Sequence, residues 1–267
     1  MLNLKVNQKL NKDQIREIAP SVFTKVPSKE VSKHYVHIPT EVVIDDMGKL
    51  GWDVMDVKEV KARKSNTKGF QKHLLVFRNE DIVIDGEDGD TVFPQILLTN
   101  SHDGKNAFTF TAGLFRMVCE NGLVISTKEF SSVKVRHMGY DFKTLQVQIN
   151  DIINQLPLTV ESMNKMKNIQ LEKETAIKFA ERALETRFTK KELKRIEIDI
   201  QQILTPTRDE DQGNDLWSIF NVVQEKMIDG GFEYQAGGKF RKAREIKNFR
   251  QDIKVNEKLF NLALEYI

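Results

Sequence analysis

VFPQILLTNSHDGKNAFTFT, residues 92–111, is the stretch of sequence that decides the fold class. Two runs rich in apolar and aromatic residues, 92–99 and 107–111, flank a polar turn at 102–105. This turn contains Asp-Gly, which tolerates the left-handed backbone conformations that hairpin turns need. The stretch therefore predicts two antiparallel strands joined by a hairpin.

The strand pattern extends to both sides of this hairpin, because apolar and polar residues alternate with a period of two from Trp52 to Arg136. The polar loop 63–69 joins the first two further strands, and Asn121-Gly122 marks a turn before the last two. These further strands are predicted at 54–62, 70–78, 82–84, 123–126 and 133–136. Together the runs predict an antiparallel meander.

In most of the remaining chain, apolar residues recur at intervals typical of helices. Thr40 is predicted to open a short helix that ends near Gly51, and a second helix begins at Phe142 and is closed by Pro157. Beyond this proline every element is predicted to be helical, because apolar residues recur at three- and four-residue intervals. The predicted elements are a long helix carrying Met163 to Leu184, one opened by a capping box at Thr189, one from 214 to Gly230-Gly231, and one over 255–266.

The whole sequence thus predicts an α+β fold, with an antiparallel sheet in the N-terminal half packed with helices and an all-helical C-terminal half. Its predicted parts are an N-terminal arm at 1–33, a β-rich α+β domain at 34–157 and a helical region at 158–267. A short strand at 34–38 opens the β-rich domain. The helical region either stands alone or packs on this domain as one unit.

The composition is that of a soluble globular protein, with 40% hydrophobic and 30% charged residues in a chain of 267. The start of the chain lacks the unbroken apolar run of a secretory signal, so a cytoplasmic protein without a membrane partner is predicted. A single cysteine, Cys119, excludes an intramolecular disulfide and a multi-cysteine zinc site. The net charge of only +2 means that any electrostatic function depends on local patches.

A set of landmark residues occurs together over 35–267. They are Lys72-His73, Ser101-His102-Asp103-Gly104, Gly113-Leu114-Phe115-Arg116, Cys119, Asn121-Gly122, Arg136-His137, Trp217, Asn221, Gln224, Gly230, Asn256 and Leu259-Phe260. In these residues the chain resembles the domain-of-unknown-function family nine hundred and thirty-two, whose members occur as phage- and plasmid-like proteins. The resemblance implies a phage- or plasmid-type protein of a mobile genetic element, and it carries no reaction over to this chain.

Two segments are rich in lysine and arginine and contain aromatic residues. Cations that track phosphates beside rings that stack on bases suit single-stranded nucleic acid. The alternative is that the charges form ordinary solvated faces, diluted by Glu59, Glu233 and Glu245. The first segment holds Lys58, Lys61, Arg63, Lys64, Lys68, Lys72 and Arg78, the second holds Lys239, Arg241, Lys242, Arg244, Lys247 and Arg250, and the aromatic residues are Phe70, Tyr234, Phe240 and Phe249.

Four further polar residues, Arg116, Asn121, Arg136 and His137, could converge on one pocket if their two segments are neighbours in the sheet. Guanidinium groups beside a glycine-bearing turn suit an anionic ligand. The alternative is that the arginines pair with acidic neighbours and tie the sheet to the helices. The residues predicted to contact nucleic acid are Arg63, Lys64, Lys68, Lys72, Arg116, Asn121, Arg136, His137, Lys239, Arg241 and Arg244.

The sequence offers little support for catalysis and predicts no cofactor and no metal. Ser101, His102 and Asp103 are consecutive and cannot face one another as a triad does, and His34 and His37 would point to opposite faces of a strand. A thiol nucleophile would need Cys119 and His137 together, but a lone cysteine among apolar residues is more often buried. No phosphate-binding loop occurs at the Gly-Gly-Lys of 237–239.

Three functions follow, in order of preference. The first is a non-enzymatic nucleic-acid-binding factor for replication, recombination or protection of a mobile element, with single-stranded DNA as the favoured partner and homo-oligomerisation as an aid. The second is a host-targeting or virion-associated interaction protein that uses the charged helices at 159–204. The third is an enzyme of unknown reaction with Glu120, Asn121, Arg136 and His137 at its site, His137 being the candidate acid–base group.

Overall fold

The structure is a computed structural model that describes residues 8–62, 65–85, 91–116, 121–124, 133–135, 141–208 and 211–267. The chain divides into two compact units, an N-terminal unit of residues 2–156 and a C-terminal unit of residues 157–267. Helix α3 (Phe142–Lys167) begins in the first and ends in the second. No helix of the described residues is long and apolar enough to cross a membrane.

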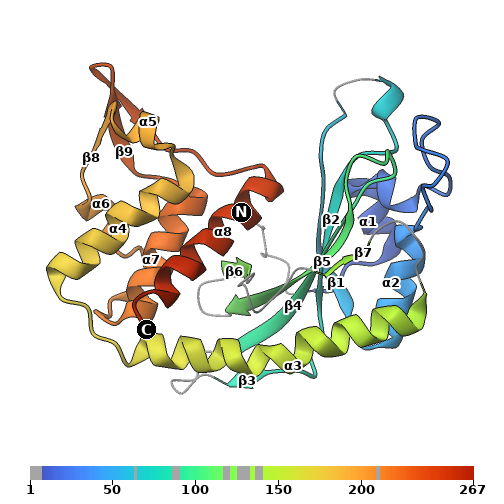
Figure 1. Cartoon of the computed structure of the whole chain (residues 1–267), viewed down its shortest axis with the longest axis horizontal. Coiled ribbons are helices and arrows are strands. Elements are labelled where there is room, and N and C mark those ends of the chain that lie inside the picture. The colour runs from blue at the N-terminus through green and yellow to red at the C-terminus, as the bar shows by residue number, and fades with distance from the viewer. Residues whose placement is uncertain are drawn as a thin grey trace. The chain divides into compact units, whose positions relative to one another are not determined.

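The N-terminal unit is built on a seven-stranded antiparallel sheet (Figure 1). This confirms the prediction of an α+β fold with an antiparallel sheet in the N-terminal half. The main path runs β1-β2-β4-β5-β6, with β3 paired to β4 and β7 paired to β5. The hairpin over 92–111 is confirmed by the register of β4 with β5, in which Leu98 lies opposite Phe110. The strands are β1 (Asp53–Glu59), β2 (His73–Arg78), β3 (Ile84–Asp85), β4 (Thr91–Asn100), β5 (Phe108–Arg116), β6 (Asn121–Val124) and β7 (Val133–Val135).

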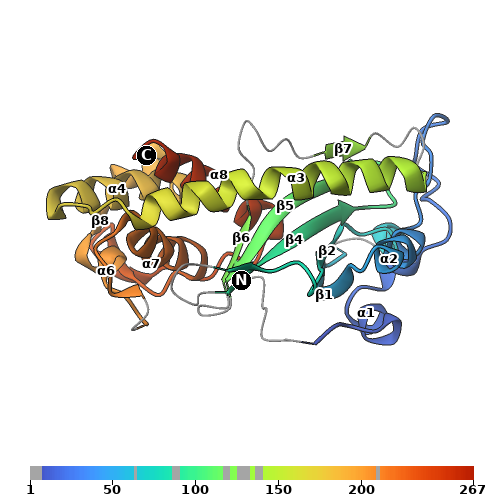
Figure 2. The same ribbon diagram turned by 90° about the horizontal axis from the view of Figure 1, so that it is seen from below.

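Strand β2 is buried along its whole length, because elements cover both of its faces. Helix α2 (Thr40–Lys49) packs against β1 and lies where the sequence predicted, with Gly51 at a φ of 80° just beyond it, but Thr40 is its first residue and Pro39, not Thr40, is its N-cap. The first half of α3 lies along the sheet (Figure 2), where Ile149 and Trp52 are both buried.

The segment predicted to be an irregular arm differs in the structure, where its described residues are folded onto the sheet. It contains α1 (Lys12–Ile18), which has a complete capping box at Asn11, and the 3-10 helix η1 (Pro20–Phe23). Ile15, Ala19 and Val22 are buried. Two helical elements this short bury few side chains each, and so leave no periodic pattern to read in the sequence.

The strand predicted at 34–38 does not form, because side chains rather than a backbone ladder hold this segment. The Tyr35 hydroxyl donates to the carbonyl of Ser101, and His37 Nε2 lies 3.2 Å from the carbonyl oxygen of Thr24. Pro157 also does not close a helix, since α3 continues through it to Lys167. The proline removes one helical hydrogen bond, and buried residues on either side, Ile149 and Met163, keep the helix in place.

The C-terminal unit is not all-helical, which corrects the prediction. Beside its helices it holds a three-stranded antiparallel sheet in the order β10-β9-β8. The capping box at Thr189 is confirmed, but its helix lasts one turn before β8. The elements are α4 (Lys173–Arg187), α5 (Lys190–Leu193), β8 (Ile196–Ile198), α6 (Gln201–Leu204), α7 (Leu216–Asp229), β9 (Glu233–Ala236), β10 (Lys239–Lys242) and α8 (Phe249–Leu264).

The long helix predicted from Met163 to Leu184 is in fact two helices, α3 and α4. Between them Gln170 forms an isolated antiparallel bridge with Asp215, the residue that caps α7. Helices α4, α7 and α8 then pack together around Phe179, Phe220 and Phe260, all fully buried. This core is the platform that carries the small sheet and the surface of α8.

Candidate nucleic-acid interface

The second basic segment of the sequence forms a hairpin of β9 and β10. Gly237 and Gly238 make its two-residue turn with φ values of 57° and 74°, a conformation that residues with a Cβ rarely adopt. In the strand register of the hairpin, Arg241 lies opposite Tyr234 and Lys242 lies opposite Glu233. All four residues of β10 are exposed, so this edge strand presents its side chains to solvent.

Alternation along β10 divides its side chains between two faces. Lys239 and Arg241 lie on the face of Tyr234, while Phe240 and Lys242 lie on the other. Each face therefore carries positive charge. Phe240 is 78% exposed, in contrast to Phe249, which is 4% exposed.

The segment that joins β10 to α8 is fixed to the end of α7. Gly231 donates to the carbonyl of Ala243, and Ile246 donates to the carbonyl of Ile228. Gly230 sits at a φ of 76° so close to this segment that a Cβ would lie 2.5 Å from the Ala243 oxygen. The two cationic elements are therefore held in a defined relation within the unit.

Arg187, at the end of α4, strengthens this connection from the other side. Its guanidinium donates to the carbonyl of Met227 at 2.6 Å and to the carbonyl of Arg244. Burial lowers the pKa of Arg187, and its guanidinium lies over the rings of Phe188 and Phe232. Arg187 is thus a half-buried cation that links the end of α7 to the segment after β10 through their backbone carbonyls.

Helix α8 adds a row of exposed cations, Arg250, Lys254 and Lys258, spaced by four residues and therefore on one face of the helix. Asn248 caps the helix, and its side chain accepts from the backbone N–H groups of Arg250 and Gln251. The row lines a pocket of about 1010 Å³ between the start of α8 and the end of α4, called here the α8 pocket.

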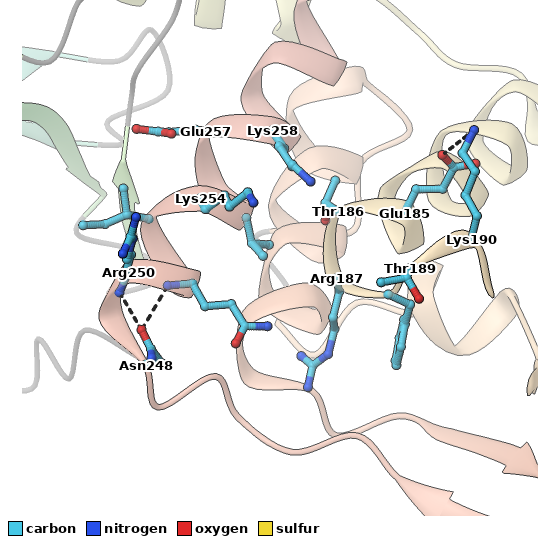
Figure 3. Close-up of a pocket in the computed structure, with 14 residues that line it drawn as sticks. Glu185, Thr186, Arg187, Thr189, Lys190, Asn248, Arg250, Lys254, Glu257 and Lys258 are labelled. Carbon is cyan, nitrogen blue, oxygen red and sulfur yellow. Dashed lines mark hydrogen bonds and ion pairs between the residues drawn. The ribbon is translucent and has the colours of Figure 1, made fainter. Parts of the chain in front are cut away.

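Charge in the α8 pocket is predominantly positive. Figure 3 shows Lys254 and Lys258 extending from α8 toward the end of α4. The cations of the lining are Arg187, Lys190, Arg250, Lys254 and Lys258, and the carboxylates are Glu185 and Glu257, which gives a net charge of +3. Lys190 lies 3.8 Å from Glu185, so these two charges offset each other and the excess positive charge comes from the other cations of the lining.

Most cations of the hairpin and of α8 have no counter-ion. Among the residues that the structure describes, no ion pair involves Lys239, Arg241, Lys242, Arg250, Lys254 or Lys258. Some other cations are paired, as in Arg182 with Glu265 and Arg208 with Glu225, whereas Lys173 and Lys178 of α4 also have no ion pair with any described residue. The hairpin and α8 thus carry six exposed cations without an ion pair in the described parts of the chain, on two consecutive elements of one unit.

Sequence reasoning named Lys239, Arg241 and Arg244, which lie on β10 and in the segment after it. It missed Lys254, Lys258 and Arg187. A signal for the two lysines was present, because with Arg250 they recur every four residues, but the helix was predicted only from 255 and the pattern began before it. Nothing in the sequence pointed to Arg187, whose contacts are made by backbone carbonyls distant in the chain.

The first basic segment is less cationic at the surface than its composition suggested. Lys68 is exposed in the loop after the 3-10 helix η2 (Ser65–Thr67), and Lys72 is half-buried next to buried His73. Arg78 is only 3% exposed, with its guanidinium 5.2 Å from the centre of the Phe93 ring. Arg63 and Lys64 lie outside the described residues.

Of the four polar residues proposed to converge in the sheet, the structure describes the backbone of Arg116 and Asn121. Arg116 lies opposite Asn121 in the pairing of β5 with β6, of which the structure describes the backbone. Strand β7 pairs with the other end of β5, where Val135 lies opposite Phe108, roughly 25 Å along the strand from Arg116. Arg136, His137 and Cys119 lie outside the described residues.

Comparison with known proteins gives this chain a family. The model of the domain of unknown function DUF932 matches residues 27–260. The chain belongs to the DUF932 family. It is similar to two proteins of Escherichia coli (strain K12), the UPF0380 proteins YafZ and YfjQ, with 29% and 28% identity over 255 residues that cover 95% of this chain and 90% of each relative. No solved structure matches.

Several of the landmarks that suggested DUF932 lie in a buried polar cluster of the N-terminal unit. His73 is fully buried, with Nδ1 2.8 Å from Ser21 Oγ and Nε2 2.9 Å from Thr40 Oγ1. The rings of His37 and His73 lie 4.6 Å and 5.3 Å from that of His102. Within the described parts of the chain, no three His, Cys, Asp or Glu side chains are grouped to hold a metal ion.

The DUF932 landmarks of the C-terminal unit connect α7 to α8. Gln224 donates to Asn256 Oδ1 at 2.5 Å, and Asn256 in turn donates to Asp252 Oδ1 at 2.8 Å, all three being buried. Asn221 donates to the carbonyl of Trp217. A buried polar group needs such a partner. These landmarks therefore support the platform beneath the cationic surface instead of forming part of it.

Proposed function

We propose that this DUF932 protein is a non-enzymatic nucleic-acid-binding factor that grips phosphates with the β9–β10 hairpin and the cationic row of α8. The observation that carries the proposal is the set of exposed cations without counter-ions on these two elements, held together by the fixed segment 243–248. A role in replication, recombination or protection of a mobile genetic element is part of the same proposal.

The spacing of the cations suits a chain of phosphates. Arg250, Lys254 and Lys258 span about 12 Å along α8, because each residue of a helix rises about 1.5 Å. A stacked strand covers that length with about four nucleotides. Each phosphate that meets a cation releases a condensed counter-ion, which favours binding at low salt.

The proposal is tested by measuring how the affinity of the full chain for fluorescently labelled single-stranded DNA depends on salt, by fluorescence anisotropy. Each phosphate contact contributes about 0.7 to the slope of log affinity against log salt concentration. The variant Lys239→Gln/Arg241→Gln/Lys242→Gln is expected to lower that slope by about 2. Lys254→Gln/Lys258→Gln is expected to lower it by about 1.4.

The matched control is Lys173→Gln/Lys178→Gln, which removes two exposed cations from α4 that belong to neither the hairpin nor the α8 pocket. Its slope should equal that of the unaltered protein. Salt-insensitive binding by the unaltered protein, or equal losses in the control and the α8 variant, would refute the proposal. The variant Arg63→Gln/Lys64→Gln measures how much the first basic segment contributes to the slope of log affinity against log salt concentration.

A further inference from the structure

Phe240 is the most exposed large hydrophobic side chain of the described residues, at 78% against 65% for Val26, the next. Its position is fixed, because β10 pairs with β9 along its whole length and Phe240 lies opposite Gln235. Single apolar residues are common on protein surfaces. What sets Phe240 apart is its setting, between Lys239 and Arg241 in sequence and on the same face as Lys242.

The other aromatic residues of the basic segments are already engaged in the fold. Phe249 is buried, and the ring of Tyr234 lies 5.8 Å from that of Phe188 in an edge-to-face contact. Phe70 is half-buried in the segment between η2 and β2 of the N-terminal unit. Phe240 is therefore the aromatic ring of these segments that is free to accept a partner on its face.

An exposed ring with a cation beside it on the same face, as Lys242 is for Phe240, is an arrangement that suits unpaired bases. Base–aromatic stacking tolerates any sequence, because every base has a π-face, and the neighbouring cations engage the phosphates of the same strand. Lys242 stands about 7 Å from Phe240 along the strand, which is the rise of about two stacked nucleotides. In a duplex the faces of the bases are covered by their neighbours, so this ring would find no partner.

We propose that Phe240 stacks on an unpaired base and makes the C-terminal unit selective for single-stranded over double-stranded nucleic acid. This inference rests on the proposed function and adds the form of the ligand and the residue that selects it. The strand is paired with β9 along its length and the ring is already exposed, so stacking requires no rearrangement of the hairpin.

The test compares two strands of equal length in the anisotropy assay, an oligothymidylate and a strand whose sugars carry no bases. Phe240→Ala is expected to weaken binding to the oligothymidylate by about 5- to 150-fold, the range for loss of one base–aromatic stack. Binding to the strand without bases, which contacts only the cations, should stay unchanged. Phe240→Trp should bind the oligothymidylate at least as well as the unaltered protein.

Phe240→Leu separates stacking from a general apolar contact, because leucine keeps apolar surface but has no π-face. It should behave like Phe240→Ala. The inference is overturned if Phe240→Leu binds like the unaltered protein, or if Phe240→Ala weakens both strands equally. Equal weakening would mean that the ring acts through folding or self-association instead.

Failure of the inference and failure of the proposed function give different results. If the unaltered protein binds neither strand, the proposed function fails and the inference fails with it. If it binds both strands with a steep salt dependence and Phe240→Ala has no effect, only the inference fails. A duplex competitor supplies the last criterion, since Phe240→Ala should reduce the preference for single strands and leave duplex affinity unchanged.

Discussion

At the scale of single residues, His73 shows how the N-terminal unit uses a landmark histidine for structure. Complete burial lowers the pKa of its imidazole to about 4. The neutral ring lies within hydrogen-bonding distance of the hydroxyls of Ser21 and Thr40, so it links η1 and the start of α2 to β2. A proton on this ring would place an uncompensated charge in a buried site.

This gives a prediction for the pH dependence of stability. Because the folded pKa of His73 is about 4 and the unfolded value is 6.5, the unfolded chain takes up a proton first as the pH falls. The contribution of His73 to stability is full above pH 6.5 and is lost between pH 6.5 and 4, by up to about 3 kcal/mol. His73→Gln should remove that loss, although it lowers stability at pH 7.

Urea unfolding at several pH values measures this pH dependence of the free energy of unfolding. The two tryptophans allow each unit to be followed separately. Trp52 is buried in the N-terminal unit and Trp217 in the C-terminal unit. In a Trp217→Phe background, fluorescence reports the unfolding of the N-terminal unit. If His73→Gln leaves the pH dependence between 6.5 and 4 unchanged, the buried imidazole is not its source.

Asp56 gives a prediction of opposite sign. Burial raises the pKa of its carboxyl from 3.8 to about 6, so the ionised form destabilises the fold at neutral pH and folding gains stability as the pH falls through 6. Asp56→Asn keeps the acceptor of the Val57 N–H. It should raise the free energy of unfolding at pH 7 by about 1 to 3 kcal/mol and have little effect at pH 4. A loss of stability at pH 7 would contradict this account.

At the scale of elements, the end of α7 decides where the hairpin and α8 lie. Gly230 and Gly231 both have positive φ, but only Gly230 is crowded, by the backbone of Ala243. Gly230→Ala should destabilise the C-terminal unit by roughly 2 to 4 kcal/mol, because backbone strain and a close contact add. Gly231→Ala, with no atom within 4 Å of the added Cβ, should cost only the strain, about 1 kcal/mol.

The comparison is made by urea unfolding in a Trp52→Phe background, where Trp217 reports on the C-terminal unit. Equal losses for the two glycine variants would mean that the approach of Ala243 does not fix this segment. Gly230→Ala should also weaken binding of single strands, since it disturbs the segment that joins β10 to α8.

Elements with a clear pattern were predictable from the sequence. The meander of β1, β2, β4 and β5 follows from its short apolar runs separated by polar and glycine-containing turns, and α7 follows from its Asp215 cap and its glycine stop. The small sheet was not predictable. Strands β8, β9 and β10 have three or four residues each and lie among charged residues, so their apolar spacing matches a helix equally well.

The candidate site could be predicted in composition and not in geometry. The second basic segment was visible as a run of cations with aromatic residues, and the structure places these cations on β10, in the segment after it and at the start of α8. Which ring is exposed could not be read from sequence, since Tyr234, Phe240 and Phe249 differ only in their packing. The burial of Arg78 was hidden for the same reason.

At the scale of the whole molecule, a net charge of +2 conceals an uneven distribution. β10 and α8 of the C-terminal unit carry six exposed cations without an ion pair to the residues that the structure describes, while the described residues that suggested DUF932 lie mostly in the cores of the two units. The described residues that suggested the family thus belong mainly to the scaffold, and the surface residues that we propose to contact nucleic acid on β10 and α8 lie outside that set.

The central claim is that β10 and α8 contact the nucleic-acid strand, and lysine footprinting tests it most directly. The full chain is acetylated with and without saturating single-stranded DNA, and each lysine is quantified by mass spectrometry. The account predicts that DNA protects Lys239, Lys242, Lys254 and Lys258 and leaves Lys173 and Lys178 as reactive as before. Unchanged reactivity at all four predicted positions, with or without protection elsewhere in the chain, would contradict it.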